Sequence, residues 1–247
     1  MSTPITVAHL RYLVPNSFTA LSMLFGAYAI ALASDGQFQL ASWLVLWGVL
    51  LDKLDGTAAR LCHATSEFGV QYDSFADFVV FGLAPAAILF FALGRTSSGE
   101  LNLLPTIVAA LLIVANSARL ARFNVSDTDP PGVFVGIPTT LIGALLASSY
   151  LVSQKFGTLE LWNQWAPFLW MFGAAAMVSN IRLPKLAVRK NRFVNVFQFA
   201  NVAAIYVITP FMIYPEYHFA LCLLYLVCGI GSQYLKAPST KEFQHEK

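Results

Sequence analysis

Four aspartates lie within one short stretch of an otherwise apolar chain. The stretch begins Asp52-Lys-Leu-Asp55 and carries two further acids at Asp73 and Asp77. The whole chain has only 13 acidic residues, and long apolar runs flank this stretch on both sides. Carboxylates that face one another in apolar surroundings repel and lose hydration. A bound divalent cation is the simplest remedy, and a polyanionic substrate is then a natural ligand.

The spacing of the four acids predicts a mirrored hairpin. Asp52 and Asp55 are three residues apart, and Asp73 and Asp77 are four apart, so a helix places each pair on one face. Two antiparallel helices that fold back near residue 64 bring Asp52 level with Asp77 and Asp55 level with Asp73. Oxygen-only ligands suit magnesium, manganese or calcium. Four carboxylates can hold two such ions about 3.5–4 Å apart, as in phosphoryl-group displacement.

The small and basic residues between the acids favour a ligand site over structural ion pairing. Lys53 and Arg60 are the only nearby bases, too few to balance four acids. A glycine inside a helix destabilises it by about 1 kcal/mol relative to alanine. Gly56 and Gly69 therefore indicate close approach of a ligand or of the facing helix. Arg60 lies about one helical turn beyond Gly56, where it could meet a phosphate oxygen.

The composition places these acids in a membrane protein. The chain is 57% hydrophobic and 11% charged, whereas a soluble domain has about 25% charged residues. Apolar runs of about 20 residues recur along its length, and such runs cross lipid as helices. We expect an all-α integral membrane protein with about eight transmembrane helices in one bundle and no nucleic-acid partner. The expected helices run about 13–33, 39–62, 68–93, 101–123, 136–154, 161–180, 193–213 and 217–235.

The basic residues predict how these helices cross the membrane. With both termini in the cytoplasm, 13 of the 15 Lys and Arg residues lie inside and only Arg95 and Lys155 outside. The positive-inside rule favours this orientation, which puts the acids near the cytoplasmic face. Residues 1–235 are expected to form one membrane domain. Its catalytic core is expected at about 12–180, with additional helices at about 193–235 and a polar tail at 236–247.

The complete spacing, D-x-x-D-G-x-x-A-R-x8-G-x3-D-x3-D, resembles the signature of the CDP-alcohol phosphatidyltransferase family at every motif position. The segment from Pro15 to Thr19 resembles the N-terminal element of that family. Two further segments, from Asp73 to Ala86 and from Arg119 to Asn124, look like its phosphatidylserine synthase branch. The similarity is clearest over about residues 12–145.

The resemblance implies a reaction and its residues. CDP-diacylglycerol would enter from the bilayer, an alcohol would attack the phosphate attached to diacylglycerol, and CMP would leave. Asp52, Asp55 and Asp73 would hold two Mg²⁺ or Mn²⁺ ions. Asp77 would lie near the second ion and act as the general base. The residues expected to bind the CDP-lipid are Gly56, Ala59, Arg60, Gly69, Asn16 and Thr19. A homodimer is also implied, in a bacterial-type inner membrane with the active site facing the cytoplasm.

L-serine is the acceptor alcohol that we favour. Arg119 and Arg122 are three residues apart at the inner end of the fourth expected helix, and two arginines can grip a carboxylate through forked hydrogen bonds. Asn116 and Asn124 are nearby candidates for the amine or the carboxylate. Arginines at a membrane edge also bind phosphate, so glycerol 3-phosphate and inositol phosphate remain possible acceptors.

Two observations keep the alternatives open. The chain has Thr139-Thr140 after Gly136-Ile-Pro138, where the serine branch often continues with proline and small residues. A divalent-cation transporter would also keep carboxylates inside a membrane bundle. Against a transporter, the acids lie near one membrane face and no inverted repeat is visible.

Overall fold

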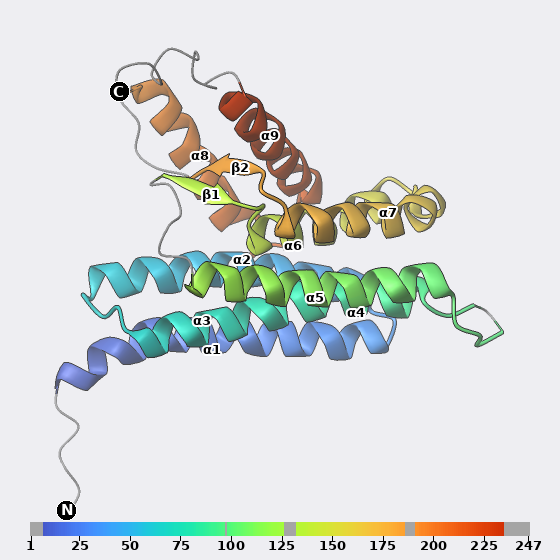
Figure 1. Cartoon of the computed structure of the whole chain (residues 1–247), viewed down its shortest axis with the longest axis horizontal. Helices are drawn as coiled ribbons and strands as arrows, with labels where there is room; N and C mark the ends of the chain where they lie inside the picture. The colour runs from blue at the N-terminus through green and yellow to red at the C-terminus, as the bar shows by residue number, and fades with distance from the viewer. Residues whose placement is uncertain (1–6, 97, 126–131, 186–190, 235–247) are drawn as a thin grey trace, which may run out of the picture.

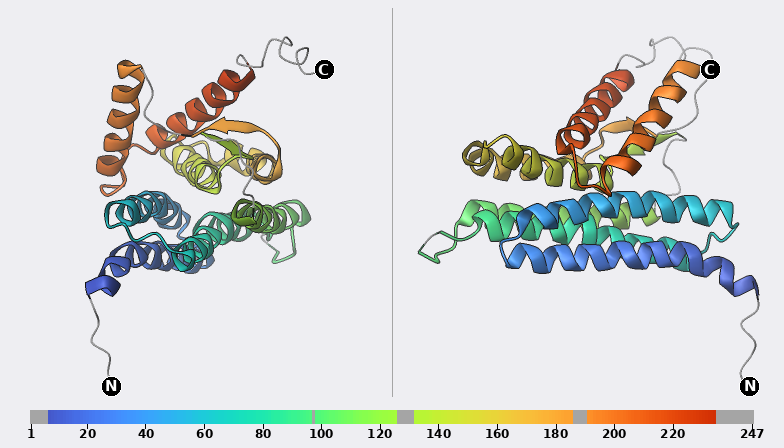
Figure 2. Two further views of the ribbon diagram at one scale, coloured as in Figure 1. Left: turned by 60° about the vertical axis from the view of Figure 1, so that its left-hand side comes forward. Right: turned by 180° about the vertical axis from the view of Figure 1, so that it is seen from behind.

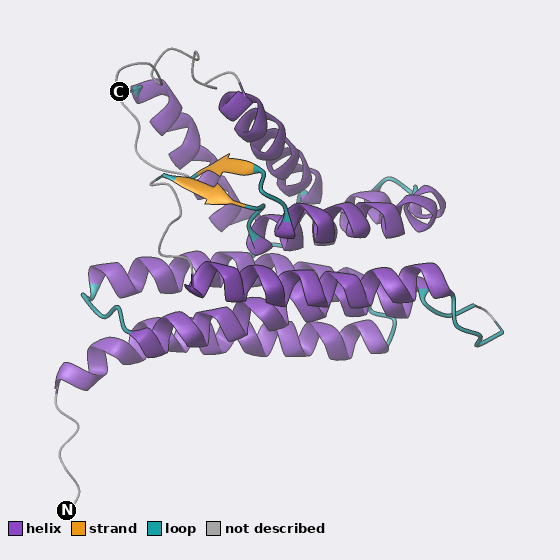
Figure 3. Cartoon of the chain, viewed as in Figure 1, coloured by secondary structure: helices purple, strands orange, loops and turns teal. Residues whose placement is uncertain are grey.

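The computed structural model describes residues 7–96, 98–125, 132–185 and 191–234, and these are almost entirely helical (Figures 1 and 3). The predicted helical class is confirmed, and the expected helices correspond to observed ones with ends that differ by a few residues. The helices are α1 (Val7–Ser34), α2 (Phe38–Leu61), α3 (Glu67–Asp77), the π-helix η1 (Phe78–Leu83), α4 (Ala84–Leu93), α5 (Leu103–Val125), α6 (Thr139–Lys155), α7 (Leu159–Val178), α8 (Arg192–Ile208) and α9 (Pro215–Tyr234). The strands are β1 (Val133–Val135) and β2 (Arg182–Pro184).

Helices α1 to α7 share one direction and stack in layers, whereas α8 and α9 cross them steeply (Figures 1 and 2). Helix α1 packs closely along α2, α6 packs on α2, and α7 packs on α5. Helix α9 packs on α6 and on β2. The axes of α1 to α7 are therefore aligned as expected for a single bundle, whereas the axes of α8 and α9 are not.

Three helices of the described chain are long and apolar enough to cross a membrane, namely Arg11–Ser34, Glu67–Leu93 and Leu103–Val125. Large apolar side chains on their outer faces are exposed, including Leu24, Phe75 and Val114. Every residue of α8 keeps part of its surface exposed, with Phe193 at 78%. Such surfaces suit contact with lipid, and the protein is an integral membrane protein.

The third expected helix is divided by the π-helix η1. Pro85 has no backbone N–H, so it cannot donate to the carbonyl four residues earlier, and its ring crowds that carbonyl. The helix widens just before it, and the N–H of Ala84 donates to the carbonyl of Val79. Glycines make room for η1: a Cβ at Gly26 would lie 2.8 Å from Val80, and one at Gly48 would also overlap Val80. Because η1 follows Asp77 directly, this packing holds the end of α3 in place.

A two-stranded antiparallel sheet joins the loop before α6 to the loop after α7. Val133 pairs with Pro184 and Val135 with Arg182. The sequence interpretation missed these strands, because three-residue strands carry almost no periodicity. Gly136 ends β1 with φ of +78°, a left-handed conformation that glycine adopts without strain. The sheet fixes the chain that enters α6 at Thr139.

Candidate active site

The turn between α2 and α3 positions the acidic residues. Helix α2 ends at Leu61, and Ser66 caps α3 by accepting a hydrogen bond from the N–H of Gly69 at 3.0 Å. The predicted reversal near residue 64 is therefore confirmed. Helices α2 and α3 pack little on each other, however, while α1 packs against both. Helix α1, more than a direct α2–α3 contact, brings the two halves of the acidic stretch together.

Three of the four aspartates form one group. Carboxylate oxygens of Asp52, Asp55 and Asp73 lie within 4.8 Å of one another. Asp55 is buried, at 6% exposure, and Asp52 and Asp73 are partly buried. This oxygen-only donor set, gathered in apolar surroundings, fits a hard divalent cation such as Mg²⁺ or Mn²⁺.

Two neighbours orient this group. Thr19 on α1 donates a hydrogen bond to Asp55 Oδ2 at 2.8 Å, and its hydroxyl also lies 3.2 Å from the carbonyl of Pro15. Lys53 Nζ lies 2.8 Å from Asp52 Oδ2. The Lys53 side chain is 59% exposed, so water screens this ion pair and limits its contribution to stability. One screened lysine leaves the three carboxylates under-compensated.

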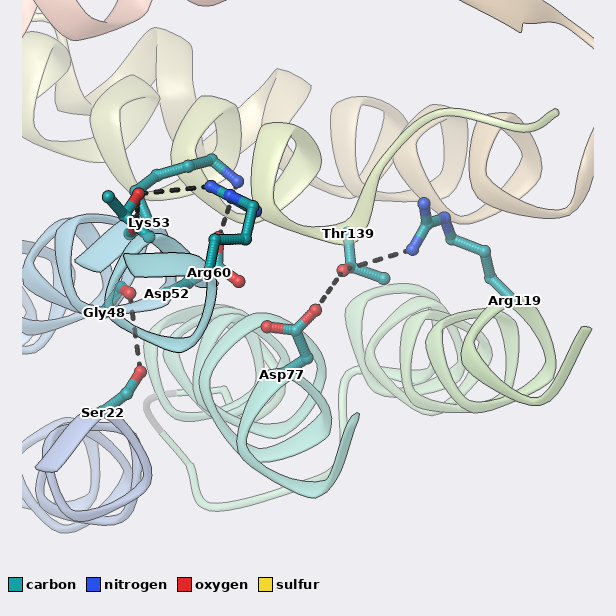
Figure 4. Close-up of polar contacts among 9 residues, drawn as sticks. Ser22, Gly48, Asp52, Lys53, Arg60, Asp77, Arg119 and Thr139 are labelled. Carbon is teal, nitrogen blue, oxygen red and sulfur yellow. Dashed lines mark hydrogen bonds and ion pairs between the residues drawn. The ribbon is translucent and has the colours of Figure 1, made fainter. Parts of the chain in front are cut away.

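Asp77 is not a member of the three-carboxylate group, and it has hydrogen-bond partners of its own (Figure 4). Its Oδ2 accepts a hydrogen bond from Thr139 Oγ1 at 3.2 Å. Thr139 Oγ1 in turn accepts one from Arg119 Nη1 at 3.5 Å. The other carboxylate oxygen of Asp77 points toward the side on which Asp52 lies (Figure 4). Asp77 therefore links the acidic hairpin to α5 and to the start of α6.

Of the residues expected to bind the CDP-lipid, Thr19 contacts the three-carboxylate group directly, and Gly56 follows Asp55 in the chain. A Cβ at Gly56 would meet nothing closer than Arg60 Nη1 at 3.6 Å, so space is open there. A Cβ at Gly69 would lie 3.2 Å from Ser66 Oγ and 3.8 Å from Asn16 Oδ1. Neither glycine touches the backbone of a facing helix. At Gly56 the geometry supports room for a ligand, whereas at Gly69 the side chains of Ser66 and Asn16 fill the space beside the glycine.

Two exposed side chains near the carboxylates, Lys53 and Arg60, are basic. Arg60 is exposed and donates to Thr57 Oγ1 at 3.3 Å, and it lies near Lys53 above Asp52 (Figure 4). Ala59 is partly buried one residue earlier. A cationic pair beside the carboxylates can receive an anionic ligand as it approaches.

The four residues expected to bind serine do not gather at one place. Arg119 is 7% exposed, and it is linked to Asp77 by hydrogen bonds through Thr139. Asn116 is fully buried against Gly82 of η1, and its amide atoms have no hydrogen-bond partner among the described residues. Asn124 lies on another side of α5, where it donates to Ser74 at 3.0 Å and to Gln71 at 3.2 Å. Asn124 therefore contacts the side of α3 that carries Ser74, whereas Arg119 is the one of these three that is linked to Asp77.

Arg122 is engaged with backbone carbonyls. Its guanidinium donates to the carbonyls of Val135 at 3.0 Å, Ser179 at 3.2 Å and Val178 at 3.3 Å, and also to that of Met177. Three of these carbonyls belong to the end of α7, where a helix leaves acceptors unsatisfied. In this structure Arg122 ties the end of α7 to β1.

Sequence reasoning missed Thr139 as a neighbour of Asp77. Its only signal was the departure from the usual residues after Pro138, which carried no information about which helix it would face. Ser66 was also missed, although a serine three residues before Gly69 at a helix start is an ordinary N-cap pattern.

The geometry defines a class of protein. It is a helical membrane protein in which three clustered carboxylates, near one end of its helices, are suited to bind divalent cations. The sequence matches the profile of the CDP-alcohol phosphatidyltransferase family over residues 12–178. This range covers more than half of the chain and includes α1 to α7. The chain belongs to the CDP-alcohol phosphatidyltransferase family.

Curated relatives narrow the resemblance. A CDP-diacylglycerol–serine O-phosphatidyltransferase of Helicobacter pylori is 41% identical over 176 residues, covering 70% of this chain and 72% of the relative. One of Methanocaldococcus jannaschii is 30% identical over 224 residues, covering 88% and 92%. An archaetidylserine synthase of Methanothermobacter thermautotrophicus is 29% identical, covering 70% of each chain. The Methanocaldococcus match is long enough to extend beyond the 176 residues shared with the Helicobacter protein.

Proposed function

We propose that the protein transfers a phosphatidyl group from CDP-diacylglycerol to L-serine, with phosphatidylserine and CMP as products. The observation that carries this proposal is the group of three carboxylates with Asp77 beside it, in a chain of this family. The printed names of the relatives support serine: two say CDP-diacylglycerol–serine and one says archaetidylserine. The donor lipid differs among these names, whereas the acceptor is shared.

Asp52, Asp55 and Asp73 would hold divalent cations, two Mg²⁺ or Mn²⁺ per site, with Asp77 near the second. When bound, such ions neutralise charge on the diphosphate and stabilise the departing CMP. Thr19 supports the site by donating to Asp55, which limits the orientations of that carboxylate. Its proposed part in CDP-lipid binding is therefore indirect.

Asp77 would take the proton of the attacking hydroxyl. The serine oxygen forms a bond to the phosphorus attached to diacylglycerol, the bond from that phosphorus to the CMP oxygen breaks, and CMP leaves with the electron pair. The serine proton passes to the free oxygen of Asp77, which points toward Asp52. A carboxylate within hydrogen-bond reach of the alcohol is suited to this role.

The nucleotide would lie over the hairpin beside Gly56, where space is open. Ala59 and Gly69 would border it, and Arg60 would bind a phosphate oxygen. Asn16, whose Oδ1 lies close to Gly69, would contact the same ligand.

For the acceptor, the contacts favour Arg119 as the group that holds the serine carboxylate. It lies next to Asp77 through Thr139, and a guanidinium binds carboxylates through two parallel hydrogen bonds. Asn116, Asn124 and Arg122 remain proposed members of the acceptor site, with roles that act through packing and helix position. The same charges could bind a phosphate, so glycerol 3-phosphate and inositol phosphate are the acceptors to exclude.

The proposed topology has eight crossings, both termini in the cytoplasm and a cytoplasmic active site, in a bacterial-type inner membrane. It is supported by the distribution of Lys and Arg. The inclined helix α8 is also apolar, and all of its residues are partly exposed. We also propose a homodimer. We propose the same domain limits as the sequence predicts, with the membrane domain at 1–235, the core at about 12–180 and further helices at about 193–235. The predicted tail at 236–247 lies outside the described residues.

One assay tests the function. Purified protein is supplied with CDP-diacylglycerol, Mn²⁺ or Mg²⁺, and in turn serine, glycerol 3-phosphate, inositol, inositol phosphate or choline, and the lipid product is identified. We expect CMP release that depends on both serine and metal, with phosphatidylserine as the product. A different lipid product would show that another alcohol, and not serine, is the acceptor. Metal uptake without release of CMP from CDP-diacylglycerol in the presence of any of these acceptors would instead favour a transporter.

A further inference from the structure

We propose that Thr139 is a positioning residue, whose hydroxyl holds the Asp77 carboxylate in the orientation that receives the acceptor proton. The inference rests on the proposed function, in which Asp77 is the base. It concerns a residue outside the acidic motif, on a helix that begins more than 60 residues later. Thr139 is 1% exposed, so its hydroxyl is directed by protein partners and not by bulk water.

The direction of the hydrogen bonds follows from donor chemistry. A guanidinium only donates, so Arg119 Nη1 must occupy a lone pair of Thr139 Oγ1. The single hydroxyl proton is then left for Asp77 Oδ2, which accepts it at 3.2 Å. Donation from Arg119 polarises the hydroxyl and strengthens its bond to the carboxylate. The order Arg119 to Thr139 to Asp77 therefore has one consistent direction.

This arrangement divides the two oxygens of Asp77 between two tasks. Oδ2 is occupied by Thr139, whereas the other oxygen points toward Asp52 (Figure 4). Rotation of the carboxylate would exchange the two oxygens or swing both away from the reacting centre. Since reactions are sensitive to misplacement by about 1 Å, a fixed carboxylate favours proton transfer over a freely rotating one.

Thr139 is itself held firmly. The N–H of Gly136 donates to the carbonyl of Ile181 at 2.9 Å, and that of Ile137 to the carbonyl of Ala176 at 3.1 Å. Arg122 donates to the carbonyl of Val135 at 3.0 Å. These bonds anchor the segment that enters α6 to the end of α7, to the residue before β2 and to α5. A residue fixed in this way can define the position of Asp77 on another helix.

Neighbouring Thr140 offers a matched control. It is also a threonine in the first turn of α6, and its side chain is partly buried. No side-chain hydrogen bond of Thr140 is present among the described residues. Threonine to valine keeps the branched shape and removes the hydroxyl, so both variants should preserve packing to a similar degree.

The test compares Thr139→Val, Thr139→Ser and Thr140→Val by kcat, by KM for CDP-diacylglycerol and by Mn²⁺ binding. We expect Thr139→Val to lower kcat about 10- to 100-fold, with that KM and Mn²⁺ affinity within about twofold of wild type. Thr139→Ser should recover most of kcat because it keeps the hydroxyl, and Thr140→Val should behave as wild type.

Three results would overturn the inference. They are an unchanged kcat in Thr139→Val, an equal loss in Thr139→Ser, and an equal loss in Thr140→Val. If the wild-type protein releases CMP normally and Thr139→Val is unimpaired, only the proposed role of Thr139 is excluded. A wild-type protein that releases no CMP with any alcohol removes the proposed function and this inference together.

Discussion

Asp73 and Asp77 lie one helical turn apart on α3, yet their carboxylates have different closest partners. Asp73 joins Asp52 and Asp55 in a group whose oxygens lie within 4.8 Å of one another. Asp77 instead accepts a hydrogen bond from Thr139, which is itself bound by Arg119. One carboxylate faces other negative charges, and the other faces a donor backed by a positive charge.

The difference shows how identical side chains in one motif can take unequal tasks. Clustered carboxylates need a cation to compensate their repulsion, so the first group is suited to hold metal. A carboxylate with one oxygen bound and one directed to the reacting centre is suited to accept a proton. The division depends on which helix faces each residue: α1 and α2 for Asp73, α5 and α6 for Asp77.

The largest expected effect comes from breaking the metal group. Asp73→Ala should lower transfer by on the order of 10³-fold or more, since the site loses metal and with it charge compensation. Mn²⁺ binding to the purified protein should fall as well, and excess Mn²⁺ should not restore CMP release. Asp35→Ala, an exposed acid after α1, is the matched control. Recovery of Asp73→Ala at high Mn²⁺ would show that this carboxylate is dispensable for metal.

Asp77→Asn should separate the two regions most clearly. We expect transfer to fall about 10²- to 10⁴-fold, because the amide cannot take the proton, while Mn²⁺ affinity stays close to wild type. CMP release and Mn²⁺ titration on the same preparation measure both. Near-normal turnover would remove Asp77 as the base. If Asp77→Asn lost as much Mn²⁺ affinity as Asp73→Ala, Asp77 would belong to the same metal site as Asp73.

The two arginines of α5 should respond differently. Sequence alone predicts that Arg122→Ala raises the KM for serine far more than that for CDP-diacylglycerol. The carbonyl contacts of Arg122 lead us to expect instead a loss of stability of about 1–3 kcal/mol, seen as a lower unfolding midpoint. Arg119→Ala should raise the KM for serine about tenfold or more. A selective serine effect in Arg122→Ala with unchanged stability would reinstate the sequence hypothesis.

Lys53→Met is expected to have the smallest effect, because the Lys53 side chain is largely exposed. Without metal, loss of this cation leaves the three carboxylates less compensated, so the unfolding midpoint in chelator should fall by the equivalent of about 1 kcal/mol or less. Added Mn²⁺ should remove the difference. Lys155→Met, which breaks the pair with Glu216 at 2.6 Å, should shift the midpoint equally with and without metal.

Much of the fold could be predicted because long apolar runs in the sequence indicate membrane helices. The interruption at η1 was less visible, although Pro85 is its physical cause. The β1–β2 pairing could not be predicted, because three-residue strands from distant loops depend on how α6 and α7 bring those loops together. The inclination of α8 and α9 is likewise a matter of tertiary packing (Figure 2).

The sequence by itself determined the acids, their spacing and the reversal between them, because helical periodicity and turn chemistry are local. It also determined the family, since the family motif is a pattern of residue types and spacings that can be read directly from the sequence. The tertiary structure alone decided which acids share a group and which partner Asp77 receives. It placed Arg119 beside Asp77, turned Arg122 to the end of α7 and sent Asn124 to another side of α5. These outcomes depend on how helices rotate and pack against one another, which spacing along a single helix does not specify.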